Sequence, residues 1–204
     1  MNLEKFKNSV LSQQCKKIRE QILNYQKYID PIGRLVSNRG GWQSRFNFEF
    51  PFYDDWTKYF FESCEMYYSD YVAKFYKKLT WQYDQKWKTD VWFNINWSGD
   101  YNKEHSHVPP DIPNEFFYLP NYNPEIEEYR DFWLPYASGC FYVTDSHNTF
   151  FVSKDSERKY IDFNAGDFWI GNPNLDHGVN VNKQNDPRIS ISFNIEPIVD
   201  RELK

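Results

Sequence analysis

The sequence is poor in cysteine, and its cysteines form no pattern that would bind a metal or build a disulfide framework. Three of the 204 residues are cysteine, at Cys15, Cys64 and Cys140. Their number is odd, and no two of them have the CxxC spacing of a thiolate metal site or a redox motif. We therefore expect a reducing compartment, the cytoplasm, and a core that is stable without disulfides.

The N-terminus also lacks a long apolar run. Seven of the first twenty residues are charged, and the uncharged stretch between them, residues 8–15, is short and largely polar, so this segment has neither the apolar run of a signal peptide nor that of a membrane span. We expect a protein that is not exported by this route and has no membrane partner.

Positive charge is in deficit. Lys and Arg together number 24 against 29 for Asp and Glu, which gives a formal net charge of -5. Such a chain has no overall positive field to attract a phosphate backbone. Nucleic acid is therefore not the expected partner, although exposed aromatic side chains can stack on single-stranded bases with little help from charge.

Aromatic residues are abundant instead. They make up 21% of the chain, and all hydrophobic residues together 40%, so much of the buried area has to come from Trp, Tyr and Phe. No repeat, Gly/Ser linker or low-complexity tract divides the sequence. We expect residues 1–204 to form one domain, with a length sufficient for its own core.

The pattern of the sequence changes near residue 88. Apolar residues recur at helical spacing from Leu3 to about Tyr28, and aromatic residues recur every three or four positions from Asp54 to Leu79. Residues 1–87 are therefore predicted to be a helical part. The aromatic face of the second helix is expected to pack on a sheet.

Short β-type runs broken by Gly, Asp, Asn and Pro follow, a pattern typical of an antiparallel sandwich or barrel. The predicted strands are Val91 to Asn96, Ser138 to Thr144, Thr149 to Ser153, Tyr160 to Phe163, Asp167 to Ile170, Gly178 to Asn182 and Arg188 to Glu196. The last strand alternates most clearly, with apolar side chains on one face and polar side chains on the other. Its polar face predicts a polar cavity or solvent opposite the core.

A proline-rich insertion, residues 108–137, interrupts the strands. It holds six prolines and is too long for a simple strand connection. Because it directly follows a histidine pair, we favour a lid that shapes the substrate site over a surface excursion.

The chain has four histidines, and two of them lie in His105-Ser106-His107. On an extended segment residues i and i+2 project to the same side, so both imidazoles can reach one metal ion. Such a pair is a weak signal by itself. His177 lies in a turn-rich segment and could be either a further ligand or a hydrogen-bonded loop residue. His147 is expected to be a solvated residue at a hairpin tip.

Arg188 follows His177 by eleven residues, and Ser190 lies on the same face of the predicted strand. A guanidinium group offers paired donors and the hydroxyl adds another, so the two side chains together suit a carboxylate. The alternative for an arginine at the end of a strand is a surface ion pair.

These motifs, in this order, resemble the double-stranded β-helix family of iron(II)/2-oxoglutarate-dependent oxygenases. The shared order is an HxH or HxD/E element, a distal His, and an Arg with Ser or Thr two residues later. More narrowly, Trp92 to Glu196 resembles a group of 2-oxoglutarate oxygenases found in bacteria and tailed phages. The matching segments are Asn94-Ile95-Asn96, Gly99-Asp100-Tyr101-Asn102, His105-Ser106-His107, Ser138-Gly139-Cys140-Phe141-Tyr142-Val143, Gly166-Asp167, His177-Gly178-Val179 and Arg188 to Asn194.

The resemblance implies an α+β, mainly β fold. A double-stranded β-helix, the jelly-roll or cupin-like core, would span residues 88–199, with the N-terminal helices packed on its sheet. It also implies Fe(II) as metal, 2-oxoglutarate as co-substrate and O2 as oxidant. The implied reaction is hydroxylation of a small-molecule or peptide substrate with release of succinate and CO2, and the substrate itself is not identified.

The resemblance further implies where the co-substrate binds. Arg188 and Ser190 would take the far carboxylate of 2-oxoglutarate. Asn94, Asn96 and Tyr142 are the expected further polar contacts, although each could instead satisfy a hydrogen bond inside the barrel.

The metal, on the same resemblance, would be held by His105, His107 and His177. The wider family usually has a carboxylate at the position of His107, so His107 could instead lie outside the ligand set, with Asp111 or Glu104 in its place. We favour three histidines, because Glu104 would point away from His105 on an extended segment and Asp111 lies beyond two prolines.

The sequence leaves two other functions open. One is a cupin-like metalloenzyme that uses the same histidines without a keto acid, and the pair formed by Arg188 and Ser190 argues against it. The other is a non-enzymatic jelly-roll binding protein with incidental histidines, which would need no metal.

Overall fold

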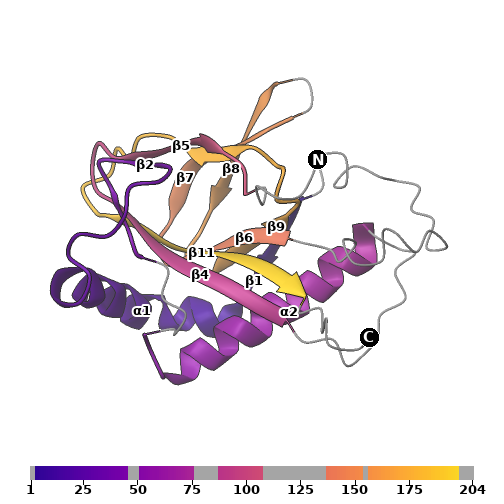
Figure 1. The fold of residues 1–204 in the computed structure, drawn as a ribbon, viewed down its shortest axis with the longest axis horizontal. Helices are drawn as coiled ribbons and strands as arrows, with labels where there is room; N and C mark the ends of the chain where they lie inside the picture. The colour runs from indigo at the N-terminus through magenta and orange to yellow at the C-terminus, as the bar shows by residue number, and fades with distance from the viewer. Residues whose placement is uncertain (1–2, 46–50, 76–86, 108–136, 154–155, 198–204) are drawn as a thin grey trace, which may run out of the picture.

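The computed structural model describes residues 3–45, 51–75, 87–107, 137–153 and 156–197. Within these ranges two helices, α1 (Ser9–Tyr28) and α2 (Asp55–Phe75), lie on one side of two antiparallel sheets (Figure 1). The three layers are therefore a helical layer, an inner sheet that contacts the helices, and an outer sheet beyond it.

The inner sheet has six strands, β1 (Leu3–Lys7), β3 (Trp42–Gln43), β4 (Trp87–Asn96), β6 (Ala137–Tyr142), β9 (Asp167–Gly171) and β11 (Arg188–Pro197). The outer sheet has five, β2 (Asn38–Arg39), β5 (Tyr101–His105), β7 (Ser146–Val152), β8 (Arg158–Phe163) and β10 (His177–Val179). The inner order is β1-β9-β6-β11-β4-β3 and the outer order β2-β5-β10-β7-β8. From β4 onward the chain passes back and forth between the two sheets, as in a jelly roll.

Strand β11 shows why the inner sheet has two different faces. Ile189, Ile191, Phe193 and Ile195 are fully buried in the core shared with the helices. The alternate side chains point the other way, toward the outer sheet, because successive residues of a strand face opposite sides. The alternation predicted from the sequence is confirmed, and the polar face does line a cavity.

The helices cover the apolar face of the inner sheet. Leu11 and Ile18 of α1 belong to the same buried cluster as the strand residues. From α2, the ring of Phe60 lies 6.1 Å from that of Phe141 and 6.0 Å from that of Phe168, measured between centroids. Aromatic side chains therefore join the helices to the sheet, and the opposite face of the sheet stays available for polar groups.

The first helix starts later than its periodicity suggested. Residues Leu3–Lys7 form β1, which pairs antiparallel with β9, and the helix begins at Ser9. The reason is local, since the side chain of Asn8 accepts a hydrogen bond from the Leu11 amide at 2.9 Å and so caps the helix. Phe6, whose spacing fitted the helix, stacks on Tyr67 instead.

The other predicted elements agree with the structure apart from their ends. Four strands were not predicted, namely β1, β2, β3 and β5, and two of these have only two residues. The proposed lid at 108–137 lies outside the described residues except for Ala137, which belongs to β6. Among the described residues no helix is long and apolar enough to cross a membrane.

Candidate functional site

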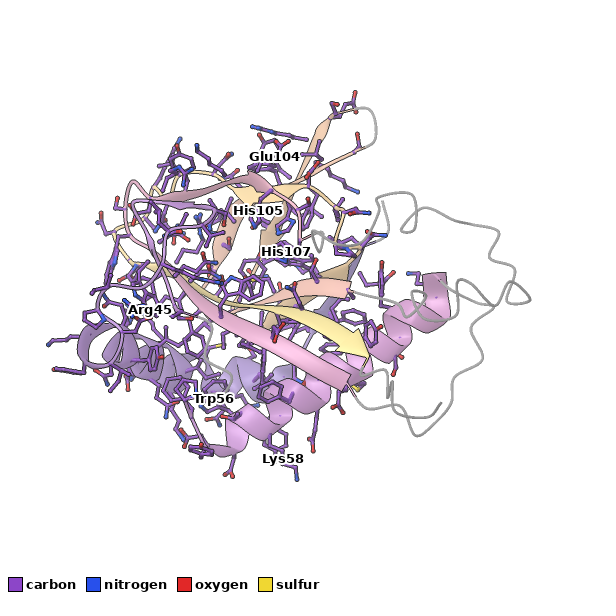
Figure 2. The ribbon with its side chains drawn as sticks, in the orientation of Figure 1. Arg45, Trp56, Lys58, Glu104, His105 and His107 are labelled. Carbon is purple, nitrogen blue, oxygen red and sulfur yellow. The ribbon has the colours of Figure 1, made fainter. Side chains whose placement is uncertain are left out.

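Three histidines lie close together, and Figure 2 shows two of them, His105 and His107, in the space between the two sheets. His105 ends β5 and His177 begins β10, and the two residues are direct partners in the antiparallel register. His107 follows β5 by two residues, and its amide donates to the Pro173 carbonyl at 2.7 Å. The ring centroids of the three imidazoles lie 4.6 to 5.1 Å apart. One potential ligand atom from each falls within 4.8 Å of the others.

Each imidazole has its Nδ1 atom in a hydrogen bond. Nδ1 of His105 lies 2.8 Å from the Lys103 carbonyl, and Nδ1 of His177 lies 2.8 Å from the Leu175 carbonyl. Because a carbonyl oxygen can only accept, both Nδ1 atoms carry the proton, and the lone pair of each neutral ring is on Nε2. Nδ1 of His107 lies 2.9 Å from Oδ1 of Asn194. The three Nε2 atoms are the ones left for a metal.

Burial keeps the three rings neutral. It lowers the pKa of His105, and it holds the pKa of His177 well below its ordinary value, with the other two imidazoles adding to the effect. Burial likewise lowers the pKa of His107 to about 4, helped by His105 and opposed by the hydrogen bond with Asn194. A neutral imidazole is the form that binds a metal, so the donors are ready near neutral pH.

Two carboxylates were considered from the sequence as alternatives to His107. Glu104 is exposed and pairs with Arg158 at 2.9 Å, and Figure 2 shows it on the side of β5 away from His107. Asp111 lies outside the described residues. Within the described part of the chain the clustered donors are the three histidines alone.

A polar cavity, partly open to solvent, adjoins the histidines. It is lined by Ser37, Gln43, Trp92, Asn94, Asn96, Asn102, His105, Cys140, Tyr142, Thr149, Trp169, His177, Gly178, Val179, Arg188, Ser190 and Ser192. The structure therefore brings the five predicted co-substrate residues to one cavity together with two of the three histidines.

Arg188 is the charged group of this wall. It is 5% exposed, and its Nη1 donates to the Asn180 carbonyl at 3.0 Å. Its Nη2 is buried without a hydrogen-bond partner among the described residues. Burial lowers the pKa of Arg188 to about 10, so the guanidinium stays positive at neutral pH. A buried cation with an unused donor is costly unless an anion joins it.

A row of polar side chains crosses the inner sheet beside Arg188. Strand register aligns Tyr142, Ser190, Asn94 and Gln43 on four neighbouring strands. Asn94 Nδ2 lies 3.5 Å from Ser190 Oγ and 2.9 Å from Ser192 Oγ. The row therefore offers amide and hydroxyl groups along the floor of the cavity.

Asn96 and Tyr142 differ in how far their polar groups are satisfied. Nδ2 of Asn96 is buried and has no partner among the described residues. The hydroxyl of Tyr142 lies 3.1 Å from Thr149 Oγ1, which is the internal role that the sequence left open for it. Asn96, beside Arg188 in the register of β4 and β11, is thus the second unused donor at this end of the cavity.

Several cavity residues were missed from the sequence. Trp92 could have been found, since it precedes Asn94 by two residues on a predicted strand and so faces the same side. Its ring lies 5.3 Å from that of His107. Gln43 comes from the two-residue strand β3, which no periodicity signals, and it is 3% exposed.

His147 is exposed, as predicted, but it lies in β7 rather than in a turn.

No protein-family model matches the sequence, and no curated protein sequence matches it. Solved structures do match the fold. A prolyl-4-hydroxylase from Pseudomonas putida has a TM-score of 0.65 and 8% identity, covering 96% of this chain and 92% of that one. The viral collagen prolyl hydroxylase from Paramecium bursaria Chlorella virus-1, solved as a 2-oxoglutarate complex, has a TM-score of 0.60 and 12% identity, covering 98% and 97%.

A third similar structure is HygX from Streptomyces hygroscopicus with nickel, 2-oxoglutarate and hygromycin B bound. It has a TM-score of 0.56 and 12% identity, covering 96% of this chain and 83% of that one. Identities this low establish the fold alone. The chain has the jelly-roll fold of these 2-oxoglutarate-binding proteins, and the fold class predicted from the sequence is confirmed.

Proposed function

We propose that the chain is an Fe(II)- and 2-oxoglutarate-dependent oxygenase that hydroxylates its substrate and releases succinate and CO2. One observation carries the proposal. Three clustered neutral imidazoles, whose Nδ1 atoms are bonded and whose Nε2 atoms are left for a metal, lie at a polar cavity that two of them line together with a buried arginine, and that arginine has a donor without a partner among the described residues. The cavity thus joins a site for a metal to a site for a carboxylate, and a keto acid that chelates the metal needs both.

The donors fit the metal. Imidazole nitrogen suits iron as well as zinc, copper and nickel, and the hydrogen bonds at Nδ1 direct the remaining nitrogen of each ring to the common centre. His105, His107 and His177 would hold the ion. When bound, Fe(II) with 2-oxoglutarate supplies the activation of O2 that the side chains of the cavity cannot provide.

The protein's own contribution is to bind and orient. The guanidinium of Arg188, with the Ser190 hydroxyl, would pair with the far carboxylate of 2-oxoglutarate. Asn96 would add its unused Nδ2 donor there, and Asn94 and Tyr142 would contact the body of the co-substrate. Anchoring one end fixes the direction in which the keto acid lies, so its other end reaches the histidines in one orientation.

Proteins of similar fold differ in the kind of molecule that they bind. Hygromycin B is a small molecule bound by one similar protein, and another is named for collagen, a polypeptide. We propose a small-molecule or peptide substrate for this chain, with O2 as the oxidant.

The test is metal content and turnover of the purified protein. The parent should hold iron and convert 2-oxoglutarate slowly to succinate even without substrate. His105→Ala, His107→Ala and His177→Ala should each lose most of the iron, whereas the exposed His147→Ala should keep it. Iron without any succinate would favour a cupin-like metalloenzyme, and a parent that binds no metal would favour a non-enzymatic binding protein.

A further inference from the structure

The imidazole of His107 is held differently from those of His105 and His177. The Nδ1 atoms of His105 and His177 bond to backbone carbonyls two residues back in their own segments. These acceptors are fixed by the chain itself. His107 lies beyond the end of β5, and its Nδ1 bonds to a side chain from the other sheet, Asn194 of β11.

Asn194 is firmly placed for this contact. It lies in the centre of the inner sheet, where its neighbours in register are Asp90 of β4 and Ser138 of β6. Its side chain points to the cavity side of β11, like those of Arg188 and Ser192, because the residues between them face the core. A strand in the middle of the sheet thus directs the amide oxygen of Asn194 toward the imidazole of His107, a residue that lies outside the strands.

We propose that Asn194 is a positioning residue that fixes His107 as the third metal ligand. By accepting the Nδ1 proton at 2.9 Å, the amide oxygen selects the tautomer whose lone pair is on Nε2 and fixes the rotation of the ring. Without this acceptor, an imidazole can place its proton on Nε2 and so block its own donor atom. The proposal rests on the proposed function only in that a metal binds the three histidines.

This role also explains why a histidine can serve where a carboxylate is more usual. A carboxylate presents lone pairs on both oxygens and needs no choice of tautomer. An imidazole needs a partner on its second nitrogen, and among the described residues the partner of His107 is the Asn194 side chain rather than a backbone carbonyl. The amide of Asn194 meets that need without adding a charge to the site.

The test compares two substitutions in the apoprotein and measures the proton position directly. Asn194→Leu removes the acceptor at similar size, and Asn194→Asp keeps an acceptor. In the parent, ¹⁵N shifts of labelled histidine should show His107 protonated at Nδ1. In Asn194→Leu the form protonated at Nε2 should appear, and in Asn194→Asp it should stay absent.

Metal affinity is the second readout, taken by titrating Co(II) against the visible absorption of the bound ion. Asn194→Leu should raise the dissociation constant about 10- to 100-fold, the usual effect of losing a partner of a ligating histidine. Asn194→Asp should recover affinity to within about tenfold of the parent. The matched control is Asn24→Leu on the exposed face of α1, which should change neither readout.

Two results would overturn the proposal. One is an Asn194→Leu variant with the affinity and the His107 tautomer of the parent. The other is an Asn194→Asp variant that stays folded and keeps the Nδ1 proton yet binds as weakly as Asn194→Leu. A parent that binds no Co(II) would instead refute the metal centre of the proposed function, so the two failures are distinguishable.

Discussion

Arg188 brings a positive charge into a cavity wall whose other described side chains are neutral. The remaining lining groups are amides, hydroxyls, a thiol, aromatic rings, Gly178, Val179 and two imidazoles kept neutral by burial. Nη1 of Arg188 donates to the Asn180 carbonyl, and its Nη2 has no hydrogen-bond partner among the described residues. At the scale of single residues, the charge and geometry of this side chain define what the cavity can bind.

Arg188→Ala should therefore weaken the binding of 2-oxoglutarate by about 2 to 5 kcal/mol, the range for truncating one partner of a buried, hydrogen-bonded charge pair. Iron binding should survive, since the three histidines are unchanged. Calorimetry of the iron-loaded protein under anaerobic conditions measures the loss. Arg19→Ala is the matched control, because Arg19 forms a surface contact with Asp186 at 3.4 Å. Unchanged affinity in Arg188→Ala would show that the carboxylate binds elsewhere.

The sequence was informative about residues on long strands and silent about those on short ones. Arg188 and Ser190 were placed on one face because the long strand β11 shows its alternation in the sequence, whereas Asn94 was identified through the family resemblance. Gln43 was missed, because a two-residue strand has no period to detect. The partner of His107 could not be predicted either, since the contact between Asn194 and the end of β5 depends on how two sheets face each other.

At the scale of elements, the helices determine which face of the inner sheet is left for chemistry. Both α1 and α2 contribute to the cluster that buries the apolar face. The predicted start of α1 was wrong because the apolar spacing of residues 3–7 fits a helix and a strand about equally over so short a stretch. The cap at Asn8 and the pairing of β1 with β9 decide between them.

Phe60→Ala tests how much α2 contributes to this layer. Phe60 is fully buried between the rings of Phe141, Phe168 and Phe193. Its truncation should lower the free energy of unfolding by about 3 to 5 kcal/mol, from lost burial and the cavity left behind. Tyr59 is the neighbouring residue and is 44% exposed, so Tyr59→Ala should change the free energy of unfolding by no more than about 0.5 kcal/mol. Urea unfolding provides both values, and equal effects would contradict the described packing.

At the scale of the whole molecule, the metal site lies where the two sheets are tied together. His105 and His177 belong to the outer sheet, and His107 is bonded to Asn194 of the inner sheet. A ligand that binds only the folded state stabilises it by an amount set by its concentration and affinity. Metal should therefore stabilise the folded state against unfolding, because folding is what brings the three histidines together.

We expect the folded state to gain about 2.7 kcal/mol when free metal is at 100 times its dissociation constant. The melting temperature should rise with added Co(II) and return to its starting value on addition of a chelator. His177→Ala is the control and should show little or no rise. A similar rise in this variant would mean that the metal binds somewhere other than the three histidines.

The measurement that tests the central claim most directly is an anaerobic titration of the apoprotein with Fe(II) and 2-oxoglutarate, followed by visible absorption. We predict a metal-to-ligand charge-transfer band that appears only when both Fe(II) and 2-oxoglutarate are present. The band should be absent in His177→Ala, and in Arg188→Ala it should require a much higher concentration of 2-oxoglutarate. A parent protein that binds Fe(II) but never develops the band at saturating 2-oxoglutarate would contradict the account.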